Sequence, residues 1–71
     1  MAQQIEHLVK MANQIALNVG AQDDVDALAK KTANHIQRFW TRDMQAQLRN
    51  YWQAGGEDLA PAVRRMLEMQ A

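Results

Sequence analysis

Apolar side chains recur every three or four residues through most of this sequence, and over no useful length do they alternate with polar ones. That spacing places apolar side chains on one face of an α-helix, whereas a half-buried strand requires strict alternation. In residues 2–19 the predicted buried face consists of Ile5, Leu8, Val9, Ala12, Ile15, Ala16 and Val19. The pattern predicts an all-α fold: a small helical bundle of three to four short helices, forming a single domain over residues 1–71.

Glycine, proline and helix-capping residues divide the rest of the chain into segments. The expected N-caps of the second, third and fourth helices are Asp23, Thr41 and Asp58. The apolar face of the second helix reaches Trp40, and a third helix is expected over residues 42–53. Thr41 would produce either a break or a kink between them. Gly55-Gly56 should end the third helix, and Pro61 is tolerated in the first turn of the last one.

The composition limits what such a bundle can bind. The chain has 71 residues, eight Lys+Arg against eight Asp+Glu, a formal net charge of zero and no cysteine. Zero net charge argues against a general binder of nucleic acids or anionic membranes. The lack of cysteine excludes disulfides, thiolate-held iron–sulfur clusters and cysteine zinc sites. No hydrophobic run exceeds three residues and no signal-peptide core is visible, so we expect no membrane association and a cytoplasmic location.

The residues needed for catalysis are largely missing. The sequence holds no serine or cysteine, its only threonines are Thr32 and Thr41, and His7 and His35 fall on different predicted helices. A nucleophile needs a base within hydrogen-bond reach. Gly55-Gly56 lacks the lysine and the spacing of a phosphate-binding loop. We therefore expect no enzymatic activity, no bound cofactor and no metal site in this chain.

A basic stripe is the first candidate functional feature. Lys31, His35, Arg38 and Arg42 are spaced by four, three and four residues, so they share one edge of the second helix if that helix continues to residue 42. This edge could dock an acidic surface or phosphates. It could equally be a solvated face without a partner.

An aromatic cluster is the second candidate. Phe39, Trp40, Tyr51 and Trp52 are the only aromatic residues of the FWY class. Neighbours on a helix project about 100° apart, so the two members of each pair cannot both point at the centre of a thin core. Either both pairs belong to a wide core stripe, or one member of each pair is an interface anchor, a role typical of Trp, Tyr and Arg.

Three blocks of residues resemble those of a known family. Residues 11–15 read Met-Ala-Asn-Gln-Ile, residues 35–40 read His-Ile-Gln-Arg-Phe-Trp with Met44 following, and Ala-Gly-Gly at 54–56 precedes Leu59 and residues 61–63. In this order and spacing they resemble the small delta subunit of soluble NAD-dependent formate dehydrogenases. Where that family has Asp-Pro-Arg before the methionine, this chain has Thr-Arg-Asp at 41–43. The missing proline leaves the break less strictly enforced.

The resemblance implies a non-catalytic subunit of a large cytoplasmic complex that oxidises formate and reduces NAD. The molybdenum or tungsten pterin, the iron–sulfur clusters and the flavin would lie in its other subunits. The leading hypothesis is an accessory subunit that stabilises this complex by protein–protein contacts, chiefly with the catalytic molybdenum or tungsten subunit. The alternatives are a transient assembly or cofactor-insertion chaperone and, third, a small helical nucleic-acid-binding regulator. The expected docking residues are Lys31, His35, Arg38, Phe39, Trp40, Arg42, Tyr51 and Trp52.

Overall fold

Four α-helices make up most of residues 2–20 and 24–70, the part of the chain that the computed structural model describes, and these ranges contain no strand. The helices are α1 (Ala2–Val19), α2 (Val25–Phe39), α3 (Arg42–Gln53) and α4 (Pro61–Gln70). The prediction of an all-α bundle is confirmed. The bounds of α1 and α3 are those that the apolar spacing and the capping residues predicted.

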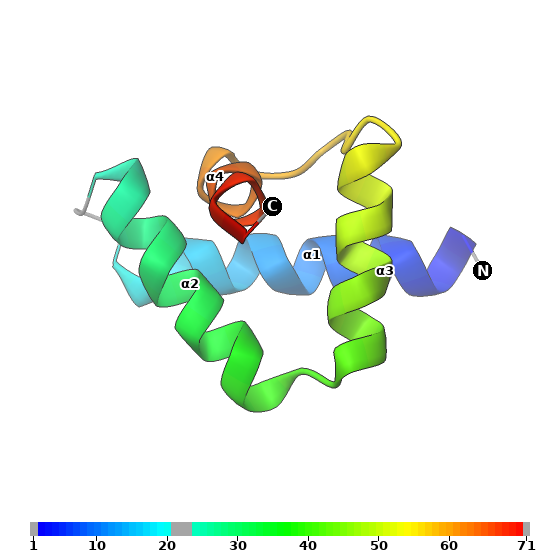
Figure 1. The fold of residues 1–71 in the computed structure, drawn as a ribbon, viewed down its shortest axis with the longest axis horizontal. Helices are drawn as coiled ribbons and strands as arrows, with labels where there is room; N and C mark the ends of the chain where they lie inside the picture. The colour runs from blue at the N-terminus through cyan, green and yellow to red at the C-terminus, as the bar shows by residue number, and fades with distance from the viewer. Residues whose placement is uncertain (1, 21–23, 71) are drawn as a thin grey trace.

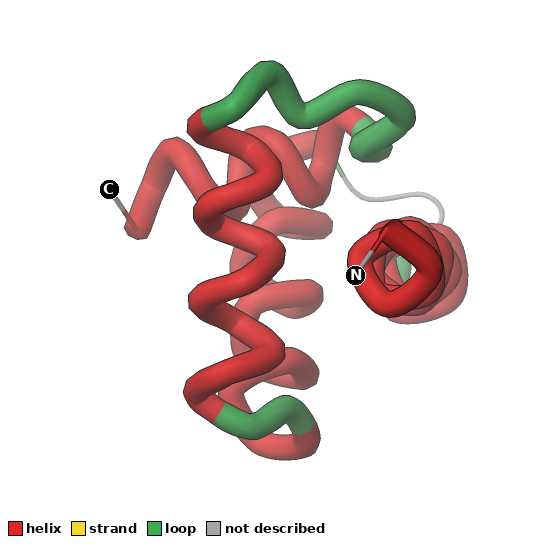
Figure 2. Tube along the Cα trace, turned by 90° about the vertical axis from the view of Figure 1, so that its right-hand side faces the viewer, coloured by secondary structure: helices red, strands yellow, loops and turns green. Residues whose placement is uncertain are grey.

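Helix α1 supports the other three helices. In Figure 1 it runs horizontally behind α2 and α3, which cross it toward its C-terminal and N-terminal ends, respectively. Figure 2 views α1 end-on, to one side of these helices. Helix α4 packs mainly on α2 and also contacts α1 and α3. This arrangement places the connection between α2 and α3 at one edge of the molecule.

Buried apolar side chains from all four helices form one core. Its members are Leu8, Val9, Ala12, Ala16, Ala29, Ile36, Trp40, Leu48, Leu59, Ala62, Val63, Met66 and Leu67. One polar side chain, that of Thr32 on α2, is fully buried among them. Its Oγ1 atom has no hydrogen-bond partner among the described residues.

The N-terminus of α2 is capped one residue later than predicted. Asp23 lies outside the described residues, and the structure has Asp24 as the N-cap. The Asp24 Oδ1 atom accepts a 2.8 Å hydrogen bond from the Ala27 backbone N–H, and Asp26 lies in the first turn. Carboxylates at this end of a helix satisfy free N–H groups and favour the helix dipole.

The chain breaks between α2 and α3 even though no proline enforces the break. Trp40 is extended, with φ −98° and ψ 146°, and Thr41 is the N-cap of α3. The Thr41 Oγ1 atom accepts a 3.1 Å hydrogen bond from the Met44 backbone N–H. The Gln45 amide donates a 3.2 Å bond to the Trp40 carbonyl. Thr41 is therefore at a true break, and its hydroxyl caps α3.

The connection between α3 and α4 corrects one prediction. Asp58 does not cap α4: it has a positive φ of 66° and precedes the helix start at Pro61. Ala60 occupies the N-cap position, since its carbonyl accepts the hydrogen bond from the Arg64 backbone N–H. Alanine has no side chain that can cap a helix. Its own N–H instead donates a 2.8 Å bond to Oδ1 of Asn13 on α1.

Candidate partner-docking surface

Phe39 and Trp40 are consecutive residues with opposite environments. The Phe39 residue is 70% exposed, whereas Trp40 is 6% exposed and belongs to the core. The backbone turns from helical to extended between them, which sends Trp40 inward under the end of α2. The pair is therefore not wholly part of the core: Trp40 belongs to it, whereas Phe39 faces solvent.

Phe39 borders a hollow between the C-terminal half of α1, the end of α2 and the start of α3. The hollow has a volume of about 460 Å³. It is lined by Met11, Gln14, Ile15, Asn18, Val19, His35, Phe39, Trp40 and Met44. The imidazole ring of His35 lies 4.7 Å from the Phe39 ring, centroid to centroid, at an interplanar angle of 44°. The two rings therefore form one continuous wall.

A second hollow, of about 250 Å³, adjoins the first. Its lining consists of Val19, Lys31, Asn34, His35, Arg38 and Phe39, so the two hollows share Val19, His35 and Phe39. Among the described residues, no aspartate or glutamate lines either hollow. We call the combined lining of both hollows the Phe39 surface. It joins an apolar depression to a cationic rim.

Only three of the four residues of the predicted basic stripe share this surface. Lys31, His35 and Arg38 lie together on α2, but Arg42 follows the break and belongs to α3. The condition for a single helical edge that includes Arg42 is not met, because α2 ends at Phe39. The stripe depended on helical continuity, and the extended Trp40 removes that continuity.

Tyr51 and Trp52 lie elsewhere. Both are half-buried and pack against the core from α3, so neither is the fully outward member of its pair. The Tyr51 hydroxyl donates a 2.9 Å hydrogen bond to the Glu57 carbonyl. Trp52 lies beside Gly56, where an added Cβ would be 3.3 Å from its Cα and 3.4 Å from its Cδ1. Both rings hold the 54–60 connection against α3.

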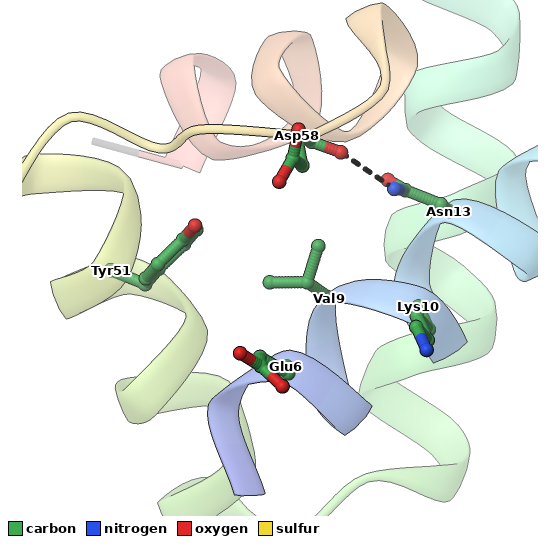
Figure 3. A pocket seen from close by; sticks show the side chains of 6 residues that line it. All are labelled: Glu6, Val9, Lys10, Asn13, Tyr51 and Asp58. Atoms are coloured by element: carbon green, nitrogen blue, oxygen red, sulfur yellow. Dashed lines mark hydrogen bonds between the residues drawn. The ribbon is translucent and has the colours of Figure 1, made fainter. Parts of the chain in front are cut away.

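A third hollow, which the sequence did not indicate, lies between α1, α3 and the α3–α4 connection. It has a volume of about 300 Å³, and Figure 3 shows its lining side chains: Glu6, Val9, Lys10, Asn13, Tyr51 and Asp58. The Asn13 amide closes one side by donating a 2.7 Å hydrogen bond to the Asp58 carbonyl. The one signal in the sequence is the amide of Asn13, which follows Val9 by four residues and so lies on the apolar side of the first helix.

The charged groups away from the Phe39 surface are partly paired. Arg65 on α4 donates a 2.7 Å hydrogen bond to Asp26 on α2, and this bond raises the pKa of the Arg65 guanidinium. In residues 2–20 and 24–70, no cluster of three or more metal-ligating side chains occurs. Within the same ranges, no helix is long and apolar enough to cross a bilayer.

Comparison with known proteins assigns the chain to a family. The sequence model of the NADH-dependent formate dehydrogenase delta subunit FdsD matches residues 7–67. Searches of curated proteins and of solved structures gave no significant match. The matched region contains all the residues of the Phe39 surface. The chain belongs to the FdsD family, the delta subunits of NAD-dependent formate dehydrogenase.

Proposed function

We propose that this delta subunit is non-catalytic and that it stabilises the assembled, cofactor-loaded formate dehydrogenase in the cytoplasm. Membership of the family implies association with the other formate dehydrogenase subunits. We assign the main contact to the catalytic molybdenum or tungsten subunit. The observation that carries the proposal is the 70% exposure of Phe39 beside an apolar hollow. A small chain that leaves a large aromatic ring uncovered gains from a partner that covers it.

The surroundings of the hydroxyl groups support a non-catalytic role. The sequence has no serine or cysteine, so Thr32 and Thr41 offer its only aliphatic hydroxyls. Thr32 is fully buried, and the Thr41 hydroxyl caps α3. The two histidines, His7 and His35, lie on different helices. Nucleophilic catalysis requires an accessible nucleophile next to a base, and no described hydroxyl meets both conditions.

The expected docking residues divide into three groups. Lys31, His35, Arg38 and Phe39 line the Phe39 surface, and we assign partner contact to them. Trp40 also lines the apolar hollow, but it is buried, so we assign it the role of supporting Phe39 from beneath. Arg42, Tyr51 and Trp52 lie outside this surface, and any contact that they make would belong to a separate part of the interface.

The proposal is tested by producing the complex with and without this chain, using an affinity tag on the catalytic subunit. We expect the delta subunit to co-purify in stoichiometric amount. Its removal should lower the temperature at which the complex loses activity, while the turnover per cofactor-loaded enzyme stays unchanged. Full activity and unchanged thermal stability in its absence would contradict the proposal. If purified active enzyme lacked the chain but needed it for cofactor loading, the chaperone hypothesis would replace ours.

A further inference from the structure

We infer that the Phe39 surface binds an acidic segment of a larger formate dehydrogenase subunit, with an apolar side chain of that segment against Phe39 and a carboxylate facing Arg38. This inference rests on the proposed function, because it presupposes that the chain joins the complex. It adds the chemistry of the partner and the part of the delta subunit that recognises it.

Phe39 lies beside an apolar hollow that could receive an apolar side chain of the partner. Phe39 is the last residue of α2; it lines the 460 Å³ hollow and is 70% exposed. Side chains from α1, α2 and α3 line the hollow, and Figure 1 shows the end of α2 joined to the start of α3 below α1. Trp40, which lines the same hollow, is packed into the core beneath it. An apolar depression beside an exposed aromatic ring is typical of interface anchors.

Arg38 supplies an exposed positive charge beside this hollow. Arg38 is exposed, lines the hollow that shares Phe39 with the apolar one, and makes no hydrogen bond or ion pair with any described residue. No described carboxylate lines either hollow, although the chain as a whole has as many acidic as basic residues. Within residues 2–20 and 24–70, therefore, no acidic side chain pairs with Arg38 at this surface. A partner carboxylate would complete it, since guanidinium groups pair with carboxylates in a two-pronged geometry.

A fourth hollow, which is apolar, gives no indication of a charged partner and supplies the control. It is lined by Leu17, Val25, Leu28 and Pro61 among others, and it has no charged lining residue among those described. Leu17 is 65% exposed, close to the value for Phe39. Because nothing there indicates the chemistry of a partner, Leu17 serves as an exposed apolar residue outside the Phe39 surface.

The test is a competition inside the cell between two full-length chains. Wild-type and variant delta subunits with distinguishable masses are produced together with the other subunits. The complex is purified through a tag on the catalytic subunit, and the ratio of the two chains in the complex is divided by their ratio in the lysate. Phe39→Ala should be depleted by about 30-fold, the loss expected for an anchor worth about 2 kcal/mol. Leu17→Ala should be incorporated within about twofold of the wild type.

The charge is tested by Arg38→Glu against Arg49→Glu, an exposed arginine on α3 that gives the same change in net charge. Here the same competition is run outside the cell, by mixing purified wild-type and variant delta subunits with tagged complex that lacks this chain. Arg38→Glu should be depleted by about tenfold or more at low salt, and the depletion should shrink when the mixture is assembled at high salt. Arg49→Glu should be depleted much less. A depletion of Arg38→Glu that is independent of salt would overturn the acidic partner.

The outcomes separate this inference from the proposed function. If no delta subunit co-purifies, the proposed function fails. If wild type and Phe39→Ala are incorporated equally, the proposed function stands and the inference fails. A third outcome is self-association, measured by sedimentation of the isolated chain. A wild-type dimer that Phe39→Ala converts to a monomer would assign this surface to a second copy and would overturn the inference.

Discussion

The side-chain amide of Asn13 on α1 donates a 2.7 Å hydrogen bond to the main-chain carbonyl of Asp58, 45 residues later in the chain. The oxygen of the same amide accepts a 2.8 Å bond from the Ala60 backbone N–H. The Asn13 side chain therefore pairs with the carbonyl of the residue before Leu59 and with the N–H of the residue after it. This pair of bonds fixes the entry to α4, where Ala60 cannot cap the helix and Pro61 has no N–H to be satisfied.

Asn13→Ala should lower the free energy of unfolding of the isolated chain by about 1–3 kcal/mol, because it leaves a partly buried N–H and a carbonyl without partners. For a chain of this size, that corresponds to roughly 4–8 °C in melting temperature per kcal/mol. Thermal unfolding followed by circular dichroism measures the effect. Gln14→Ala is the control, since Gln14 is exposed one position further along the same helix. Equal losses from the two substitutions would show that the Asn13 hydrogen bonds add nothing.

Gly56→Ala should destabilise the chain by about 2 kcal/mol, because two costs add up. Gly56 has a φ of +63°, a left-handed conformation that costs an L-residue about 1–2 kcal/mol. An added Cβ would also lie 3.1 Å from Leu59 Cδ1. Asp58→Ala provides the control, because Asp58 already has a Cβ at a φ of +66° and its side chain is exposed. Chemical denaturation should show a much smaller loss for Asp58→Ala, and a similar loss for both would remove the role assigned to crowding at Gly56.

The sequence was sufficient to predict the elements whose signals are local. The apolar spacing of residues 2–19, the Thr41 cap and the position of Pro61 all act within one or two helical turns, and the structure confirms them. The divergence of Phe39 from Trp40 followed from the same geometry, although which ring turns inward depended on the extended backbone at Trp40.

The features that the sequence did not settle each involved contacts between distant residues or a change of backbone direction. Asp58 looked like a cap because it precedes a helix, but its left-handed φ and the Asn13 bond to its carbonyl depend on the packing of α1 against the α3–α4 connection. The grouping of Arg42 with the basic stripe required a continuous helix, and the extended backbone at Trp40 ends α2 at Phe39. The Phe39 surface draws residues from three helices, so no single segment of sequence displays it.

Thr32→Val should leave the stability of the chain unchanged or raise it by about 1 kcal/mol. Thr32 is fully buried, and its hydroxyl has no hydrogen-bond partner among the described residues. A buried unpaired hydroxyl costs free energy that a methyl group of similar shape does not. Thr32→Ala is the comparison: it also removes the hydroxyl but leaves a cavity, so it should destabilise the chain. If Thr32→Val unfolds at clearly lower denaturant than the wild type, the hydroxyl must be bonded in the native protein.

Trp40→Ala and Phe39→Ala should both reduce incorporation into the complex, but only Trp40→Ala should destabilise the isolated chain. Trp40 is 6% exposed within the core, so its truncation should lower the free energy of unfolding by about 3–5 kcal/mol, a large part of the total stability of a small domain. Phe39 is 70% exposed, so Phe39→Ala should change that free energy by no more than about 0.5 kcal/mol. Denaturant unfolding of the isolated chain and incorporation into the complex measure the two effects separately. Loss of incorporation by Trp40→Ala should follow its unfolding, whereas Phe39→Ala should lose incorporation while remaining folded. A folded Trp40→Ala chain that fails to incorporate would make Trp40 a contact residue rather than a support for Phe39.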